Sequence, residues 1–103
     1  MPIGWRAIRD DIELTNGDFI ASRTRPGGVP LPAGTTAEIK WATSPSPTTW
    51  AATIDGATVS WRVEAAGVAA IPAGTKFVMW IHYPNTVTGT TDDYEWVIGV
   101  ARR

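Results

Sequence analysis

The tetrapeptide Pro-Ala-Gly-Thr occurs twice in this chain, at residues 32–35 and again at residues 72–75. Each copy precedes a run in which every second residue is apolar, namely Ala37, Ile39 and Trp41 in the first run and Phe77, Met79 and Ile81 in the second. A Pro-x-Gly turn before a period-two run is typical of a tight turn that leads into a half-buried strand. The repeat therefore predicts two β-strands that each place one face in a core.

The same pattern predicts about seven short strands and no convincing helix. The expected strands are 11–14, 19–24, 35–43, 50–54, 57–64, 75–83 and 94–101. Turn residues separate them at the spacing of roughly 8–12 residues that is typical of a β-sandwich. We expect one all-β domain, an antiparallel β-sandwich over residues 11–103. Residues 1–10 form an N-terminal arm in this interpretation, with no strand partner of their own.

Composition excludes several classes of partner. The chain has 103 residues, a formal net charge of -1 and no Cys. A charge so close to zero provides no broad basic field for nucleic acid or anionic lipid. The lack of Cys removes disulfides, thiolate catalysis and Cys-based zinc sites. No apolar run reaches the roughly 20 residues that cross a bilayer, and the N-terminal residues lack a secretory signal, so we expect synthesis in a cytoplasm.

Candidates for metal binding or catalysis are few. His82 is the only His, and the carboxylate pairs Asp10-Asp11 and Asp92-Asp93 lack the interleaved spacing of a calcium loop. A nucleophilic hydrolase needs an activated nucleophile beside an oriented base, and no Gly-x-Ser-x-Gly elbow is present. We therefore expect no enzymatic activity, no metal and no cofactor.

The six Trp residues are the most informative set of side chains. Trp41, Trp61 and Trp96 share a strand face with apolar neighbours and are predicted to lie in the core. Trp80 lies on the opposite face of its strand, beside Val78 and His82. Exposed Trp stacks on sugars or anchors protein interfaces. An interface is the preferred hypothesis and a glycan site the alternative. The candidate interface residues are Ile3, Trp5, Ile8, Trp50, Trp80 and His82.

Four short phrases, in this order along the chain, carry a resemblance to a known family. They are Asp-Ile-Glu-Leu-Thr-Asn-Gly-Asp at 11–18, Pro-Ala-Gly-Thr at 32–35, Trp50 with Ile-Asp-Gly-Ala and Val-Ser-Trp-Arg-Val over 54–63, and Asp-Tyr-Glu-Trp-Val-Ile-Gly-Val-Ala-Arg at 93–102. In these phrases the chain resembles the LtfC-like family of small β-sandwich proteins from tailed bacteriophages of actinobacteria. The resemblance extends over nearly the whole sequence.

The resemblance implies a structural component of a virion, such as a minor tail protein of the tail tip, baseplate or tail fibre. It implies assembly in the host cytoplasm, with other virion proteins and copies of itself as partners, and it carries over no catalytic residues. A capsid decoration protein and a carbohydrate-binding module for host glycans are the alternatives. In the assembly interpretation, residues 1–10 dock on a neighbouring chain through Ile3, Trp5 and Ile8.

Overall fold

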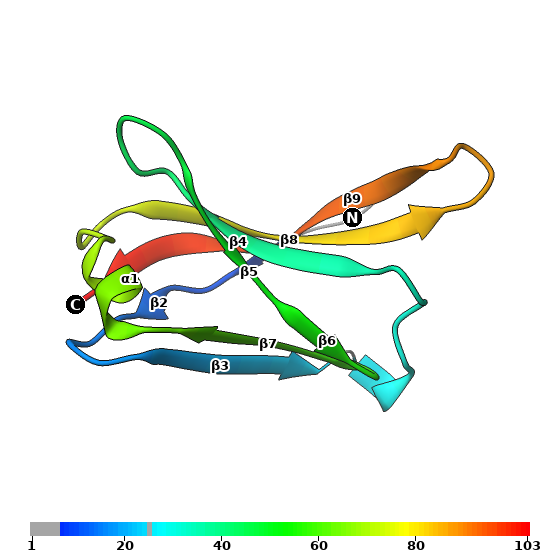
Figure 1. The fold of residues 1–103 in the computed structure, drawn as a ribbon, viewed down its shortest axis with the longest axis horizontal. Helices are drawn as coiled ribbons and strands as arrows, with labels where there is room; N and C mark the ends of the chain where they lie inside the picture. The colour runs from blue at the N-terminus through cyan, green and yellow to red at the C-terminus, as the bar shows by residue number, and fades with distance from the viewer. Residues whose placement is uncertain (1–6, 25) are drawn as a thin grey trace.

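Two β-sheets face each other in the structure, a computed structural model that describes residues 7–24 and 26–103 (Figure 1). Within these residues, the larger sheet contains β1 (Ile8–Arg9), β2 (Ile12–Glu13), β4 (Thr36–Trp41), β5 (Thr48–Ala51), β8 (Lys76–Asn85) and β9 (Thr90–Arg102). The smaller sheet contains β3 (Phe19–Thr24), β6 (Thr53–Asp55) and β7 (Thr58–Val63). A 3-10 turn, η1 (Pro26–Gly28), and a short helix, α1 (Ala65–Ala69), complete the described elements.

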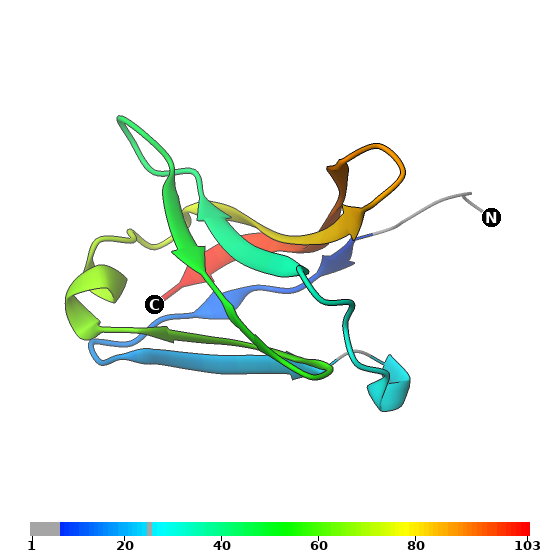
Figure 2. The ribbon, with the colours of Figure 1, turned by 45° about the vertical axis from the view of Figure 1, so that its right-hand side comes forward.

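The strand order is β1-β9-β8-β4-β5 in the larger sheet, with β2 also paired to β9, and β3-β7-β6 in the smaller sheet. The turned view of Figure 2 shows the two layers with the β5–β6 segment passing from one to the other. The predicted all-β sandwich in a single small domain is confirmed.

The two Pro-Ala-Gly-Thr turns have the same geometry. Each Thr donates its backbone N–H and its hydroxyl to the carbonyl of the Pro three residues earlier, with both hydroxyl bonds at 2.7 Å. Gly34 and Gly74 have φ values of 89° and 83°, a region that glycine enters without steric cost. The repeated phrase is thus a repeated turn, and it leads into β4 and β8, which pair with each other.

The core is built on tryptophan. Trp41, Trp61 and Trp96 are buried as predicted, with exposed fractions of 0%, 2% and 8%. The indole N–H of Trp61 donates to the carbonyl of Trp50 at 3.0 Å, whereas the indole N–H of Trp41 has no acceptor among the described residues. Ring contacts of Trp41 with Trp50 and Phe77, at centroid distances of 5.1 and 5.3 Å, hold these side chains together.

The predicted strand 50–54 is divided between the two sheets. Pairing of Ile39 with Trp50 places β5 in the larger sheet, and pairing of Ile54 with Val59 places β6 in the smaller one. Ala52 lies between them, and its N–H donates to the carbonyl of Ala37 at 3.0 Å. The single-strand prediction was wrong here because apolar alternation continues through a segment that changes sheets.

Helix α1 occupies a segment for which no element was predicted. The side chain of its N-cap residue, Glu64, makes no capping hydrogen bond. The carboxylate of Asp18 instead accepts the N–H of Ala65 at 2.8 Å. At the other end, Arg103 donates to the carbonyls of Val68 and Ile71. These capping partners come from distant positions, so a five-residue helix with no local signal could not be read from the sequence.

A β-bulge in β9 changes which residues face the core. Met79 lies opposite Val97, but the next residue, Trp80, lies opposite Glu95, so that Trp96 is the extra residue. Trp96 and Val97 are consequently both buried. The sequence predicted one uninterrupted alternation for this strand; the bulge breaks it and places Ile98, which lies opposite Val78, on the face away from the core.

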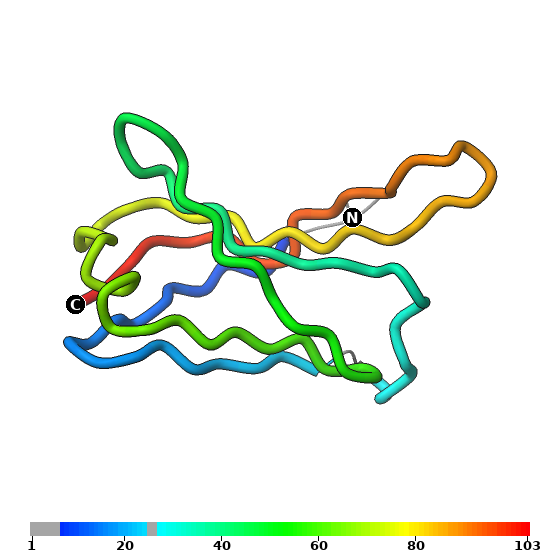
Figure 3. The backbone as a smooth tube through the Cα atoms, viewed as in Figure 1, coloured from blue at the N-terminus to red at the C-terminus, as the bar shows by residue number. Residues whose placement is uncertain are grey.

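The beginning and the end of the described chain run side by side. β1 and β2 both pair with β9 in parallel, as the trace in Figure 3 shows, with Ile8 opposite Val97 and Ile12 opposite Ala101. This corrects the expectation that residues 1–10 lack a strand partner. Residues 1–6 lie outside the described part, so the boundary proposed for the arm stays a prediction.

Strands β8 and β9 extend further than predicted. Their pairing continues to Asn85 and Thr90, so part of the expected 85–93 loop belongs to a long hairpin. The pairing of β4 with β8 ends at Thr36 and His82, and the remainder of the hairpin projects from the sandwich in Figure 1.

Candidate functional site

The face of the larger sheet that points away from the core carries the most unusual set of side chains; we call it the outer face. Every second residue of β8 points there, including Val78 and Trp80. The cross-strand pairs Val78–Ile98 and Lys76–Val100 extend the apolar area onto β9. These apolar side chains are all half-buried, so they form a continuous apolar centre on a surface with no second layer in the described structure.

Charged side chains are sorted by sign around this apolar centre. At the end where β8 begins, the basic residues are Lys76, Lys40 opposite Val78, and Arg9 opposite Ile98. Toward the projecting hairpin, the acidic residues are Glu38 and Glu95, which flank Trp80, and Asp93 opposite His82. The outer face is thus basic at one end, apolar in the centre and acidic at the other end.

His82 is held between two carboxylates at the acidic end. Its Nδ1 lies 2.6 Å from Asp93 Oδ1, and its Nε2 lies 3.1 Å from Glu38 Oε1. Burial lowers the pKa of His82, but the hydrogen bonds and charges of Asp93 and Glu38 outweigh this effect and leave the pKa above its ordinary value. Hydrogen bonds from Thr91 and then His82 lower the pKa of Asp93. His82 and Asp93 thus each favour the charged form of the other.

Trp80 lies beside this group. Its ring is nearly parallel to that of His82, with an interplanar angle of 10° and centroids 6.2 Å apart. Trp80 also lines an open hollow together with Ala7, Asp93, Tyr94 and Glu95. Trp80 is therefore the member of the apolar centre that lies next to the acidic end.

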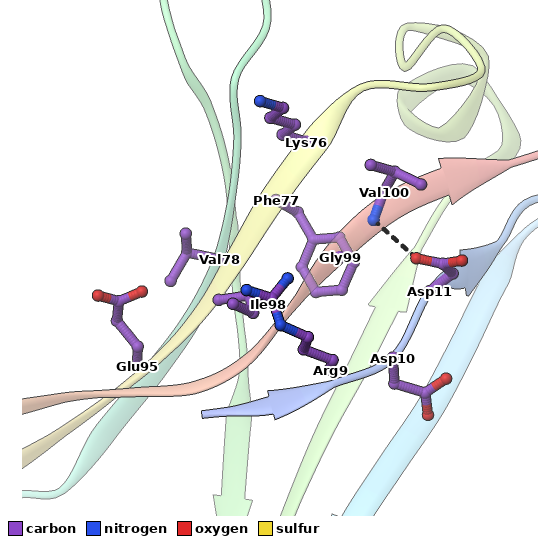
Figure 4. Close-up of a pocket in the computed structure, with 10 residues that line it drawn as sticks. All are labelled: Arg9, Asp10, Asp11, Lys76, Phe77, Val78, Glu95, Ile98, Gly99 and Val100. Carbon is purple, nitrogen blue, oxygen red and sulfur yellow. Dashed lines mark hydrogen bonds between the residues drawn. The ribbon is translucent and has the colours of Figure 1, made fainter. Parts of the chain in front are cut away.

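An open groove of about 650 Å³ runs along the outer face where β1 meets β9 (Figure 4). Val78 and Ile98 lie in its middle, with Glu95 toward one end and Lys76 toward the other, while Arg9 reaches across from β1. Asp10 and Asp11 line the groove at the end away from Glu95, so both ends of the groove contain acidic side chains.

The N-terminal border of this groove is fixed by Asp11. Its carboxylate accepts the N–H of Val100 at 3.1 Å and pairs with the guanidinium of Arg102. These two hydrogen bonds, that of Arg102 first, hold the pKa of Asp11 below its ordinary value. The backbone of Asp10 passes so close to Gly99 that a Cβ there would lie 2.0 Å from the Asp10 carbonyl oxygen. Gly99 is thus required for this crossing.

The structure brings together some of the predicted interface residues and separates others. Trp80 and His82 lie side by side on the outer face, as expected from their shared strand face. Ile8 is 45% exposed and lies in β1, at the edge of the same sheet. Ile3 and Trp5 lie outside the described residues.

Trp50 was wrongly placed among the interface residues. It is only 6% exposed, because its pairing with Ile39 turns the ring inward, where it contacts Trp41 and Phe19. Its position beside loop residues in the sequence gave no sign of this.

Sequence reasoning missed Arg9, Ile98 and Val100 as members of the outer face. The alternation of Ile98 and Val100 was visible, but without the bulge it assigned them to the same face as Trp96. Arg9 had no signal of its own, because only the pairing of β1 with β9 places it opposite Ile98.

Two further observations concern the described residues as a whole. No group of three or more His, Cys, Asp or Glu side chains suited to a metal ion occurs among residues 7–24 and 26–103. In the same part of the chain, no helix is long and apolar enough to cross a membrane.

Comparison with family models decides the classification. The model described as "LtfC-like, beta-sandwich domain" matches residues 6–103. The chain belongs to this LtfC-like family. The match begins before β1 and extends through β9, so the LtfC-like domain includes the N-terminal edge strand as well as the sandwich. The family name implies an association with bacteriophages. Searches of curated proteins and of solved structures found no match.

Proposed function

We propose that this LtfC-like protein is a structural virion component of a tailed bacteriophage that acts by protein–protein assembly in the tail tip, baseplate or fibre region. The observation that carries the proposal is the family match over residues 6–103. Its partners are other virion proteins and copies of itself, and it is assembled in the cytoplasm of the bacterial host.

The outer face supports an assembly function. Val78, Trp80 and Ile98 form a contiguous apolar area bordered by charges, which is a common property of protein interaction surfaces. Trp in such a position is among the side chains that contribute most to binding.

We also propose that the protein is not an enzyme. His82 is the only side chain with an ordinary pKa near neutrality, and both of its ring nitrogens are engaged by carboxylates. A general base needs one ring nitrogen within reach of the substrate proton. The arrangement at His82 is better suited to fixing the hairpin than to proton transfer.

Immunoelectron microscopy tests the proposed location. An antibody raised against the purified protein is applied to virions that package it, and we expect the label at the distal end of the tail. Label on the head would instead favour the capsid decoration alternative. A particle preparation that lacks the protein by mass spectrometry, while the infected cells contain it, would refute a virion role.

A glycan-binding function is the second candidate, and the nearly parallel rings of Trp80 and His82 favour it. A sugar ring stacks on such a surface while nearby carboxylates accept its hydroxyl hydrogen bonds. A glycan array probed with the wild-type protein and with Trp80→Ala tests it. Binding that is lost in the variant supports this function, and an array without binding rejects it for the glycans displayed.

A further inference from the structure

We propose that the outer face of the larger sheet binds the same face of a second copy of this chain, forming a two-fold symmetric dimer. The inference rests on the proposed assembly function and names one of its partners. It follows from the order of charges and apolar side chains along β8 and its neighbours.

The charge order makes the outer face complementary to itself. The basic half contains Arg9, Lys40 and Lys76, and the acidic half contains Glu38, Asp93 and Glu95. A second copy rotated by 180° about an axis in the face, perpendicular to the strands, places each basic half over an acidic half. In this orientation Lys40 lies over Glu38 of the other copy, and each basic half as a whole faces an acidic half, which favours one docking mode over its alternatives.

Other charges at the two ends do not reverse this pattern. Arg102, Asp11 and Asp10 lie near the basic end; Arg102 and Asp11 form an ion pair with each other, and Asp10 adds one negative charge against the three basic side chains. At the acidic end, His82 adds positive charge only when it is protonated, and it then lies between Asp93 and Glu38. Lys40 lies 3.7 Å from Glu38 of its own chain. In the proposed dimer, Lys40 also lies near Glu38 of the other copy.

The rotation predicts specific contacts. The rotation keeps each strand at the same position across the sheet and reverses its direction. β8 of one copy therefore lies over β8 of the other and runs antiparallel to it. Val78 of one copy then meets Trp80 of the other, while Ile98 on β9 lies over the Glu95 position. Arg9, at the β1 edge, comes opposite the region of Glu95 in the other copy.

The size of the face sets the expected strength. Lys76 to His82 spans six residue steps, which corresponds to about 20 Å along the strand, and the four strands β1, β9, β8 and β4 span about 15 Å across. This area lies at the small end of specific interfaces, so we expect a dissociation constant of about 10 μM to 1 mM. High local concentration in a particle would favour such a contact.

Charge exchange between two variants tests the proposed symmetry. Arg9→Glu and Glu95→Arg each replace an exposed side chain and, because the dimer is symmetric, each introduces two repulsive contacts. We expect each variant alone to dimerise at least about tenfold more weakly than wild type. An equimolar mixture restores the opposite-charge pairing at both positions, so association returns to about the wild-type level.

The masses are measured by sedimentation equilibrium from about 10 μM to about 1 mM. Arg62→Glu is the matched control, because it makes the same charge change on the exposed side of the smaller sheet and should leave the dimer unchanged. Trp80→Ala is the independent variant for the apolar centre, and it too should weaken the dimer. Circular dichroism verifies that each variant is folded.

A wild-type protein that is monomeric throughout this range overturns the inference, as do variants that dimerise like wild type or a mixture that stays monomeric. A monomeric wild type that binds an oligosaccharide through Trp80 assigns the face to glycan instead. The proposed virion function is tested separately, by whether particles contain the protein. If the protein dimerises but is absent from virions, the dimer inference stands and the virion function is refuted.

Discussion

Substitution of Gly99 by Ala tests whether the N-terminal edge strand is held as the structure describes. A Cβ at this position would lie 2.0 Å from the carbonyl oxygen of Asp10 and 2.9 Å from Oδ1 of Asp11. Real Cβ atoms do not approach backbone so closely, and neither β9 nor Asp10 can move without losing pairing. We therefore expect residues 10–11 to detach from β9.

The cost follows from the contacts that this detachment removes. The N–H of Asp10 donates to the carbonyl of Ile98 at 3.0 Å, which contributes about 1 kcal/mol. The N–H of Val100 also loses its bond to the Asp11 carboxylate, which it makes at 3.1 Å. The free energy of unfolding should fall by at least about 1 kcal/mol, and the Tm of a domain of this size by at least about 4 °C.

Thermal unfolding followed by Trp fluorescence measures the effect, and amide hydrogen exchange at Asp10 and Val100 locates it. Gly17→Ala is the control, because a Cβ there would meet only the Thr15 hydroxyl oxygen at 3.7 Å, an ordinary contact. If Gly99→Ala unfolds within about 2 °C of Gly17→Ala, the close crossing of Asp10 over β9 is refuted.

The remaining predictions concern His82, the buried Trp pair and Arg103. The folded state raises the pKa of His82 above its ordinary value of 6.5. Its contribution to stability is therefore complete below the unfolded pKa and is lost as the pH rises through the folded pKa. The Tm of the wild type should decrease between about pH 6 and about pH 9 by an amount that His82→Gln lacks. Trp61→Phe should destabilise the fold by about 1 kcal/mol more than Trp41→Phe in urea unfolding, since only Trp61 donates an indole hydrogen bond, and equal losses would contradict this. Arg103→Ala leaves the carbonyls of Val68 and Ile71 without these donors, and should speed amide exchange in residues 65–71 while exchange in β4 stays unchanged.

The sequence predicted those parts of the fold whose signals are local. The repeated Pro-Ala-Gly-Thr turns, the Asp55-Gly56 hairpin and the strand at Phe19–Thr24 all depend on neighbouring residues, and the structure contains them as predicted. The burial of Trp41 and Trp61 followed from simple alternation in the same way.

The candidate site was only partly predictable, because it depends on contacts between distant residues. Trp80 and His82 could be placed together since they share a strand face. The bulge at Trp96, the inward rotation of Trp50 and the pairing of Arg9 with Ile98 each arise from strand pairing, which a single sequence does not encode locally.

The parallel ladder between residues 8–13 and 97–102 also affects how the chain acquires its fold during synthesis. β9 lies between β8 and the N-terminal strands, so β1 and β2 have no template until the last residues of the ladder have left the ribosome. Until then Ile8 and Ile12 are exposed to solvent, and the larger sheet has an open edge at β8. The domain therefore completes its fold only after its C-terminal strand emerges, and premature termination before residue 97 yields a chain prone to aggregate rather than a shortened sandwich.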